Sequence, residues 1–310
     1  MDQASTLRQI VNHKKATDPD FAPDQGRMRV IAITSGKGGV GKTNIVLNLC
    51  MALSQRGRRV FLLDADMGLA NVDVLLGLTP RYTLEHVLKG QKGINDIILT
   101  GPHGIRLLPS SSGMSELSEL SFEQQMHLFQ LLSQINEQID YLFIDTGAGV
   151  SSNVLRFNAS ANEIIVVASP EPTSITDAYA LMKLLSIKYH IREFNLVANS
   201  VQNDQEGLGV FNRLNAACRQ FLQVGLTFLG SVPFDQNIRK AVRQQRAVFD
   251  LYPHSPAGKS IARLAVTLEE TRPAAPARAP LGAPSGAESG PDSPQLSRSF
   301  WDRLLHWKKA

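Results

Sequence analysis

A glycine-rich stretch, SGKGGVGKT at residues 35–43, lies between an apolar run at residues 28–34 and a segment of helical periodicity at residues 43–57. A buried strand that turns through glycines into a helix is typical of a phosphate-binding loop, because glycines let the backbone approach an anion at the helix N-terminus. The stretch matches two patterns at once. One is G-x-G-x-x-G, typical of dinucleotide-binding sheets, and the other is G-x-x-x-x-G-K-T, the P-loop of triphosphate-binding proteins.

Apolar runs and helical patterns alternate along most of the chain. We expect buried strands at residues 28–34, 58–66, 141–149, 163–172, 194–200 and 226–233, with 104–110 as a further candidate. We expect helices between them, notably at residues 43–57, 122–139, 176–189 and 211–223. Continuous apolar strands that alternate with helices predict an α/β fold, a mostly parallel, doubly wound sheet with helices on both faces. Ligands of such sheets bind in the loops at the carboxyl ends of the strands.

The composition limits the classes of protein to which the chain can belong. The chain has 310 residues, of which 43% are hydrophobic, so one large domain with additional segments is expected. The net charge of +4 permits attraction to anionic surfaces without requiring a nucleic acid. The two cysteines are expected to be free thiols, and the histidines show no zinc-ligand spacing. No stretch approaches the roughly 20 apolar residues of a membrane span, so we expect a soluble, cytoplasmic protein.

The chain divides into four segments. Residues 1–26 are polar, and residues 27–272 carry the alternating pattern of a folded domain. Residues 273–298 are rich in proline, alanine and glycine, so they cannot bury enough apolar area to fold and are predicted to be a disordered linker. Residues 299–310 are dense in aromatic side chains.

The residues around the glycine loop favour a triphosphate over a dinucleotide. In a dinucleotide site Asp64, at the end of the second expected strand, would bind a ribose, but Lys42 and Thr43 would have no role. In a P-loop, Lys42 reaches the β- and γ-phosphates and the Thr43 hydroxyl binds Mg²⁺. Asp145, at the end of another strand, supplies the acid that holds the metal shell. We therefore predict a P-loop NTPase and keep the dinucleotide oxidoreductase as an alternative.

The residues expected at this site fall into two groups. We expect the nucleotide phosphates to be bound by Gly36, Gly38, Gly39, Val40, Gly41, Lys42, Thr43 and Asn44. We expect Mg²⁺ and its shell to be held by Thr43, Asp64 and Asp145.

A second lysine, Lys37, lies within the loop, and KGGVGKT at residues 37–43 resembles the deviant Walker A motif of the MinD/ParA family of ATPases. The resemblance spans roughly residues 28–271 and implies ATP hydrolysis with ATP/ADP and Mg²⁺ as cofactors. In that family the first lysine reaches across an ATP-sandwiched homodimer to the partner's phosphates, which implies this role for Lys37, with Lys42 acting within its own subunit. A solvated loop lysine is the alternative reading of Lys37.

Two further segments resemble the switches of the same family. DADMGLANVD at residues 64–73 is similar to the first switch, and this implies that Asp66 orients the attacking water. DTGAG at residues 145–149 is similar to the second switch, with Asp145 at the Mg²⁺ shell.

The resemblance also implies residues around the base. Asn199 lies where the family reads adenine, and Pro233 and Phe234 would wall the base. The alternative for Asn199 is a strand-end cap.

Within the family, MGLAN at residues 67–71 is similar to the MinD branch, while the N-terminal DQASTLR resembles the DQAxxLR motif of the FlhG (FleN) family of flagellar number regulators. Residues 239–257 also resemble that family. The resemblance implies that the N-terminal segment enters and stimulates an FlhF-type GTPase of the signal-recognition class. A flagellar transcription activator and switch-complex proteins are further candidate partners. The implied activating residues, of which Gln3 carries the effect, are Asp2, Gln3, Ala4, Leu7 and Arg8. A frayed terminus is the alternative.

The last twelve residues predict an amphipathic helix that binds an anionic membrane surface. Two copies in an ATP dimer would bind more tightly than one, so we expect a cytoplasmic protein that is peripheral to the inner face of the cell membrane in its ATP state. The alternative is a helix that docks on its own domain or on a protein partner. The membrane-facing residues are Phe300, Trp301, Leu304, Leu305, Trp307 and Lys308.

Two other functions stay open. One is a MinD-type protein that places the division site. The other is a ParA-type DNA-partitioning ATPase, although no sequence-specific contact with nucleic acid is expected. A basic cluster that could contact DNA phosphates is formed by Arg239, Lys240, Arg243 and Arg246.

Overall fold

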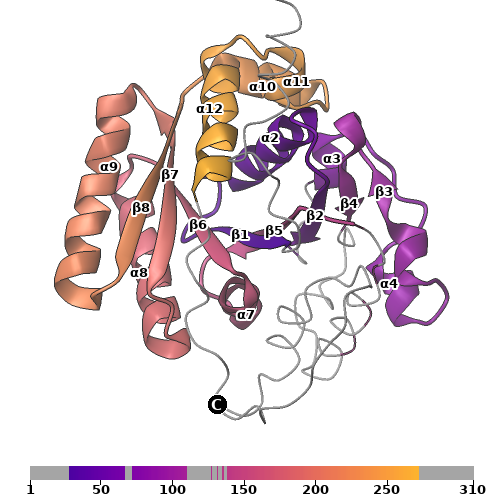
Figure 1. The fold of residues 1–310 in the computed structure, drawn as a ribbon, viewed down its shortest axis with the longest axis horizontal. Helices are drawn as coiled ribbons and strands as arrows, with labels where there is room; N and C mark the ends of the chain where they lie inside the picture. The colour runs from indigo at the N-terminus through magenta and orange to yellow at the C-terminus, as the bar shows by residue number, and fades with distance from the viewer. Residues whose placement is uncertain are drawn as a thin grey trace, which may run out of the picture.

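The computed structural model describes residues 28–66, 72–109 and 138–271, together with His127, Leu131 and Ile135. In this part of the chain one eight-stranded sheet has the order β3-β4-β2-β5-β1-β6-β7-β8 (Figure 1). All neighbouring strands are parallel except β3 and β4, which are antiparallel. The strands are β1 (Arg29–Ser35), β2 (Val60–Ala65), β3 (Leu99–Thr100), β4 (Arg106–Leu108), β5 (Tyr141–Ala148), β6 (Glu163–Ala168), β7 (Glu193–Val201) and β8 (Gly225–Pro233).

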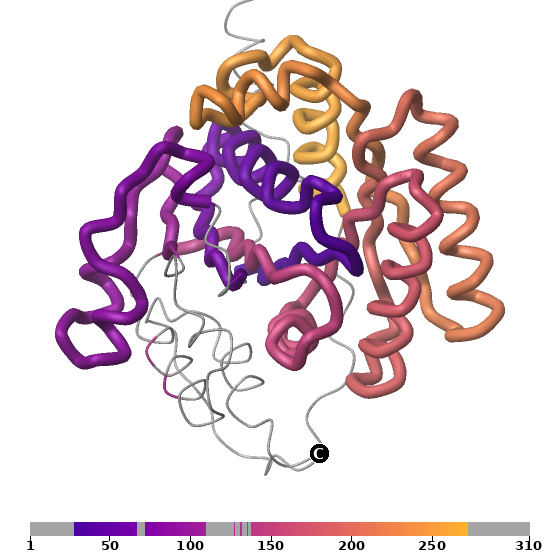
Figure 2. Tube along the Cα trace, turned by 180° about the vertical axis from the view of Figure 1, so that it is seen from behind, coloured from indigo at the N-terminus to yellow at the C-terminus, as the bar shows by residue number. Residues whose placement is uncertain are grey.

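Helices cover both faces of the sheet (Figures 1 and 2). One face carries α2 (Lys42–Gln55), α3 (Val72–Leu75), α10 (Gln236–Arg243), α11 (Val248–Leu251) and α12 (Pro256–Glu270). The other face carries α4 (Leu84–Leu88), η2 (Ile94–Ile97), α7 (Ser152–Ser160), α8 (Pro172–Tyr189), α9 (Asp204–Ala217) and the π-helical turn η4 (Cys218–Leu222). A short 3₁₀ turn, η3 (Pro102–Gly104), joins β3 to β4.

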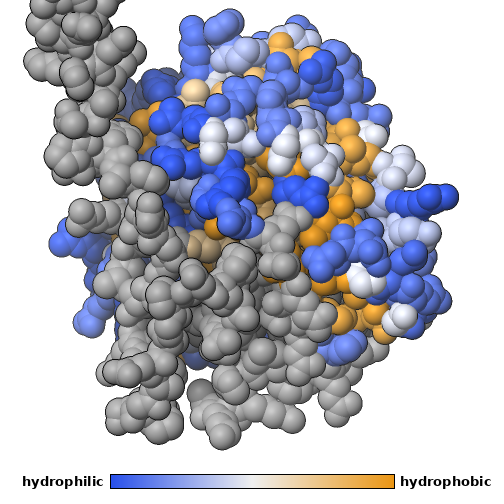
Figure 3. All heavy atoms as spheres, turned by 45° about the vertical axis from the view of Figure 1, so that its right-hand side comes forward, coloured by the Kyte–Doolittle hydropathy of each residue, from blue (hydrophilic) through white to orange (hydrophobic). Residues whose placement is uncertain are grey.

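The central strands are apolar without alternation because both of their faces are covered. In β5, Phe143 packs with α2 and α12 on one face, whereas Leu142 and Ile144 pack on the other. On the side of β3, α3 and α4, the surface carries hydrophilic residues interspersed with apolar ones (Figure 3). Burial on both faces is the reason that this sheet tolerates continuous hydrophobic strands.

The α/β fold class predicted from the sequence is confirmed. All six expected strands are present, and the candidate at residues 104–110 is β4. The strand expected at residues 163–172 was wrong beyond Ala168, because α8 already begins at Pro172, and proline suits the first turn of a helix. The antiparallel β3 was not expected from the sequence.

The helix expected at residues 211–223 was wrong at its start, whereas helical structure continues to Leu222, close to the expected end. It begins at Asp204, where the Asn203 side chain accepts a hydrogen bond from the Glu206 N–H at 2.9 Å. Its α-helical part ends at Ala217 and η4 follows. The helix expected at residues 122–139 lies almost entirely outside the described residues.

Ion pairs tie the last helix to the amino ends of the strands. Arg29 donates to both carboxylate oxygens of Glu163, at 2.8 and 2.7 Å, and to the Leu268 carbonyl at 2.6 Å. Glu269 accepts from Arg56 and, at 2.6 Å, from Arg58. The end of α12 is therefore fixed beside the starts of β1 and β2.

Candidate functional site

The glycine loop joins β1 to α2 in a backbone conformation that requires glycine. Gly39 and Gly41 have φ angles of +80° and +86°, in the left-handed region that favours glycine. At Gly36 a Cβ atom would lie 2.1 Å from the backbone carbon of Asp177 in α8, so no side chain fits there. Gly36 therefore lies directly against the backbone of α8.

The N-terminus of α2 offers its N–H groups to a ligand. The first turn contains no acidic residue, and the N-cap Gly41 supplies no side-chain hydrogen bond. The first N–H groups of a helix have no acceptor within the helix, and the helix dipole favours an anion at this end. Thr43 and Asn44 lie in this first turn.

Lys42 and Asp145 form a buried ion pair at the end of β5. The Lys42 ammonium donates to Asp145 Oδ1, and the two side chains are 6% and 1% exposed. Burial raises the pKa of the Asp145 carboxyl, while the Lys42 ammonium and the Thr43 hydroxyl oppose this rise. Asp145 Oδ2 is buried and has no hydrogen-bond partner among the described residues. A buried oxygen without a partner at this position fits a metal-bound water.

Asp64 lies beside this pair and holds the two ends of the expected first switch. The register of β2 and β5 places Asp64 opposite Asp145. Asp64 Oδ1 accepts from the Asp66 N–H at 3.1 Å, and Asp64 Oδ2 accepts from the Val72 N–H at 3.5 Å. Residues 67–71 between them lie outside the described residues.

Asp66 points to the same region from the end of β2. A Cβ atom on Gly147 would lie 3.5 Å from Asp66 Oδ1, so the carboxylate is close to the backbone of the expected second switch. The charge of Asp66 also contributes to the raised pKa of the Asp145 carboxyl. The structure therefore brings Asp145 close to Asp64 and Asp66, although about 80 residues separate it from them in the sequence.

Lys37 is bonded to α8 of its own chain. Its ammonium donates to Glu171 Oε2 at 2.7 Å and to Thr173 Oγ1 at 3.0 Å, and the Lys37 and Glu171 side chains are 38% and 63% exposed. The expected reach of Lys37 into a partner subunit stays a prediction. Glu171 was not predicted from the sequence. The signal that could have indicated it is a carboxylate shortly after β6, the strand next to β1.

Asn199 connects β7 to the glycine loop rather than only ending its own strand. Its side-chain N–H donates to the Val40 carbonyl at 2.7 Å, and a Cβ atom on Gly41 would lie 2.4 Å from Asn199 Nδ2. Asn199 Oδ1 is buried without a hydrogen-bond partner among the described residues. An unpaired acceptor here fits the exocyclic amine of adenine.

Pro233 ends β8 and Phe234 follows it, where the base wall is expected. Phe234 is 52% exposed, and the Arg239 guanidinium lies 5.7 Å from the centre of its ring. Asp235 follows, and its carboxylate accepts from the Asn237 N–H at 2.8 Å and from the Ala257 N–H at 3.1 Å. These bonds join the starts of α10 and α12 beside Phe234.

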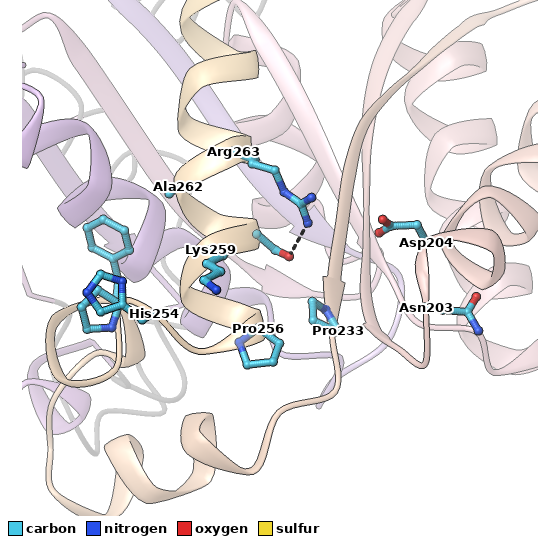
Figure 4. A pocket seen from close by; sticks show the side chains of 11 residues that line it. Asn203, Asp204, Pro233, His254, Pro256, Lys259, Ala262 and Arg263 are labelled. Atoms are coloured by element: carbon cyan, nitrogen blue, oxygen red, sulfur yellow. Dashed lines mark hydrogen bonds between the residues drawn. The ribbon is translucent and has the colours of Figure 1, made fainter.

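A pocket of about 790 Å³ lies beyond Pro233, between α12 and the start of α9 (Figure 4). Lys259 and Arg263 line it from α12, where Arg263 donates to Ser260 Oγ at 3.0 Å, while Asp204 lines it from α9. None of the lining residues belongs to the glycine loop. The phosphate-binding geometry, and not this pocket, therefore marks the nucleotide site.

The donor set suits magnesium better than a transition metal. The described ranges contain no group of three or more histidine, cysteine, aspartate or glutamate side chains that could hold a metal ion by themselves. Mg²⁺ is usually bound through one or two protein oxygens, waters and the phosphates of a substrate. The Thr43 hydroxyl and the Asp145 carboxylate, with its unpartnered Oδ2, fit that mode.

Several predicted residues cannot be placed. The N-terminal motif and the C-terminal helix lie outside the described residues, as does the linker at residues 273–298. These expectations stay predictions: Asp2, Gln3, Ala4, Leu7, Arg8, Phe300, Trp301, Leu304, Leu305, Trp307 and Lys308. Among the residues that the structure describes, no helix is both long and apolar enough to cross a bilayer.

Comparison with known proteins places these features in one family. The model of the ParA family, described as NUBPL iron-transfer P-loop NTPase, matches residues 27–269. The chain is 48% identical to the antiactivator FleN of Pseudomonas aeruginosa over 74% of this chain and 82% of that protein. It is 34% identical to the flagellum site-determining protein YlxH of Helicobacter pylori, over 85% and 89% of the two chains.

A solved structure shows the same architecture. The cell division ATPase MinD of Pyrococcus furiosus superposes with a TM-score of 0.66 and 25% identity, over 78% of this chain and 98% of that chain. These matches indicate the same family as the glycine loop and the aspartates at the strand ends. The chain belongs to the ParA/MinD family of P-loop NTPases, in the branch that contains FleN and YlxH.

Proposed function

We propose that this chain is an ATP-hydrolysing switch that controls the number or placement of flagella. The observation that carries the ATPase part is the buried Lys42–Asp145 pair, whose second carboxylate oxygen has no partner among the described residues. A buried charge pair with an unsatisfied oxygen is costly unless a ligand completes it. The flagellar part is supported by the names of two relatives, an antiactivator FleN and a flagellum site-determining protein.

In the proposed reaction, a water attacks the γ-phosphorus of ATP while the bond to the β-γ bridging oxygen breaks. The bridging oxygen leaves on ADP, and the water's protons pass to phosphate and solvent. Asp66 orients the water, which phosphoryl transfer needs more than a strong base. Lys42 would exchange its bond to Asp145 for the β- and γ-phosphate oxygens, and Thr43, Asp64 and Asp145 would hold Mg²⁺ and its shell. When bound, Mg²⁺ neutralises part of the phosphate charge.

Lys37 is the residue that would make ATP hydrolysis depend on a dimer. We propose that it leaves Glu171 and Thr173 when two subunits meet across ATP, and then contacts the partner's phosphates. The exposed Lys37–Glu171 pair costs little to break, since exposed ion pairs contribute about 0–1 kcal/mol. Hydrolysis would return Lys37 to α8 and the protein to a monomer.

Two segments outside the described residues are proposed to bind the partners of the protein. We propose that residues 1–26 stimulate an FlhF-type GTPase through Gln3, with a flagellar transcription activator or switch-complex protein as a further partner. We also propose that residues 299–310 bind an anionic membrane when the ATP dimer presents two copies. The protein would therefore cycle between the cytoplasm and the inner membrane face.

The enzymatic part is tested by phosphate release at increasing protein concentration, with wild-type chain and Asp66→Ala. We expect specific activity to rise with concentration for the wild type, because the active species is a dimer. Asp66→Ala is expected to bind ATP, remain a dimer in size-exclusion chromatography with light scattering, and release no phosphate. An undiminished rate in this variant would remove Asp66 from the mechanism.

The flagellar part is tested by the GTPase rate of an FlhF-type protein with the full chain and with its Gln3→Ala variant. Stimulation that requires Gln3 supports flagellar control. Equal rates with and without either chain would favour the division-site alternative, which the structural likeness to MinD supports.

A second candidate function rests on the surface of α10. Arg239, Lys240 and Arg243 are exposed on this helix, whereas Arg246 pairs with Asp250. ATP-dependent retention on DNA that falls with added salt would favour a partitioning ATPase. No retention at low salt would exclude it.

A further inference from the structure

Three large apolar side chains are exposed at one end of the molecule. Leu184 and Ile187 on α8 are 37% and 62% exposed, and Phe221 in η4 is 66% exposed. Single exposed apolar residues are common on soluble proteins and need no explanation. Their grouping on two packed elements, together with the charges around them, does need one. We call the group the basal surface, and it comprises Lys183, Leu184, Ile187, Lys188, Arg219 and Phe221.

Local structure holds these side chains outward. On α8, Met182 and Leu185 face the core, so Leu184 and Ile187 fall on the opposite arc. In the π-helical turn, Cys218 and Leu222 are buried, and Cys218 Sγ lies 4.0 Å from Met182 Sδ. Because residues on both sides of Phe221 are anchored, its ring cannot turn inward without unwinding η4.

The surroundings of the basal surface are cationic. Residues 183–193 and 213–225 contain five lysines and arginines and one acidic residue, Glu193. Among the described residues, no carboxylate lies within ion-pair distance of Lys183, Lys188 or Arg219. Lys188 instead lies 5.4 Å over the Tyr189 ring. Apolar tips among unpaired cations match the interfacial layer of an anionic bilayer, where apolar groups enter the acyl boundary and cations meet phosphates.

The basal surface lies at the end of the domain from which the C-terminal segment departs. The C-terminal ends of α8 and α9 lie at the end where β7 and β8 begin (Figures 1 and 2). The last turn of α12 is bonded to Arg29, the first residue of β1, at the same amino-terminal edge of the sheet. Residues 272–310, with the predicted membrane helix, follow directly.

We propose that the basal surface is a second membrane contact, in which Ile187 and Phe221 enter the headgroup layer and Lys183, Lys188 and Arg219 meet lipid phosphates. This inference rests on the proposed membrane association through residues 299–310. It adds a contact that the folded domain itself makes, at the end where β7 and β8 begin. The chain's own C-terminal helix is a poor occupant of this surface, because it carries three lysines and arginines against one aspartate and like charges repel.

The contact is measured on the full chain with a reporter at position 221. The two native tryptophans, Trp301 and Trp307, are replaced by phenylalanine, and Phe221→Trp then becomes the sole tryptophan. In buffer the reporter is expected to be quenched by iodide, as an exposed ring should be. With ATP and phosphatidylcholine vesicles containing roughly 30% phosphatidylserine, its emission is expected to shift to the blue and to be quenched by brominated acyl chains.

The vesicle affinity of two sets of variants distinguishes the contribution of the cations from that of the apolar side chains. In the wild-type background, Lys183→Gln/Lys188→Gln is expected to lower vesicle affinity by roughly 10- to 30-fold, since each cation near an anionic surface contributes about 1 kcal/mol. Ile187→Asp/Phe221→Asp is expected to lower it at least tenfold. Leu208→Asp is the matched control, because Leu208 is 46% exposed but lies near the start of α9 at the other end. Melting temperatures of all variants should match the wild type.

The outcomes distinguish this inference from the proposed function. If Leu304→Glu/Leu305→Glu weakens vesicle binding while the basal variants bind like wild type and the reporter stays open to iodide, the tail binds membrane and the inference is wrong. A reporter that is buried without vesicles, and is exposed by the tail variant, would assign the surface to the chain's own tail and overturn the inference. If the wild type binds no vesicle in either nucleotide state, the proposed membrane association itself fails.

Discussion

The two edges of the sheet both bury charged groups, yet they treat them differently. At the amino-terminal edge, Arg29 and Glu163 satisfy each other with two hydrogen bonds, and Arg29 also donates to the Leu268 carbonyl. At the carboxyl edge, Lys42 binds only one oxygen of Asp145 and leaves the other without a partner among the described residues. One edge is complete as folded, and the other becomes complete only with a ligand.

The difference indicates which buried charged groups stabilise the fold and which bind a ligand. A fully bonded pair resists substitution because either partner alone would be a buried, uncompensated charge. An incompletely bonded pair costs free energy in the empty protein, which a nucleotide and its metal ion can return as binding energy. Substitutions at the two edges should therefore separate stability from turnover.

The largest effect is expected from Lys42→Ala. Turnover should fall by at least 10²- to 10³-fold, because a charge that stabilises the transition state is removed. Stability should fall by about 3 kcal/mol, because Asp145 is left buried without its cation. Phosphate release and urea unfolding measure the two effects. The double variant Lys42→Ala/Asp145→Asn should recover most of the stability and none of the turnover, and recovery of neither would mean that the pair does not act as described.

Lys37→Ala is expected to change turnover alone. Loss of a transition-state cation supplied by a partner subunit should lower the rate on the order of 10³-fold. Stability should change by no more than about 1 kcal/mol, because the Lys37–Glu171 pair is exposed. Glu171→Gln is the control, since it breaks the same ion pair but keeps the lysine. If Lys37→Ala keeps the wild-type rate, the lysine is only a surface residue.

Arg29→Met should show the opposite pattern at the amino-terminal edge. Glu163 would lose its partner in a buried position, so stability should fall by about 3 kcal/mol. Nucleotide affinity of the folded protein should be unchanged, and titration calorimetry well below the melting temperature measures it. Arg29→Met/Glu163→Leu should restore stability, whereas reduced ATP affinity in Arg29→Met would show that the two edges are coupled.

The smallest effect is expected at Glu269, as a dependence on pH. Burial raises the pKa of Glu269, but the hydrogen bonds from Arg58 and Arg56 outweigh this effect. The pKa therefore lies below its ordinary value of 4.5. A depressed pKa in the folded state stabilises the protein above the unfolded pKa, and this contribution is lost as pH falls through the folded pKa. Glu269→Gln should cost under about 1 kcal/mol at neutral pH. Urea unfolding should show this difference shrinking as the pH falls below 4.5 and through the depressed pKa of Glu269, and a constant difference would contradict it.

The sequence predicted the elements better than the bonds between them. The strands were readable because burial on both faces makes them continuously apolar, and the loop was readable because Gly41, Lys42 and Thr43 are adjacent. The start of α9 was missed because Gly207 and Gly209 interrupt its periodicity. Contacts between distant residues carry no local pattern: Arg29 and Glu163 are 134 residues apart, as are Lys37 and Glu171. The basal surface was hidden for the same reason, since its two elements become neighbours only in the fold.

Hydrogen–deuterium exchange with and without Mg²⁺-ATP tests the central claim most directly. With Mg²⁺-ATP we expect protection at the carboxyl edge, in residues 36–44, 64–66 and 145–149, and none at Arg29 or in the last turn of α12. NADH should protect neither edge. Protection by NADH instead of ATP, or an unchanged carboxyl edge with ATP, would contradict the assignment of this edge as an incomplete triphosphate site.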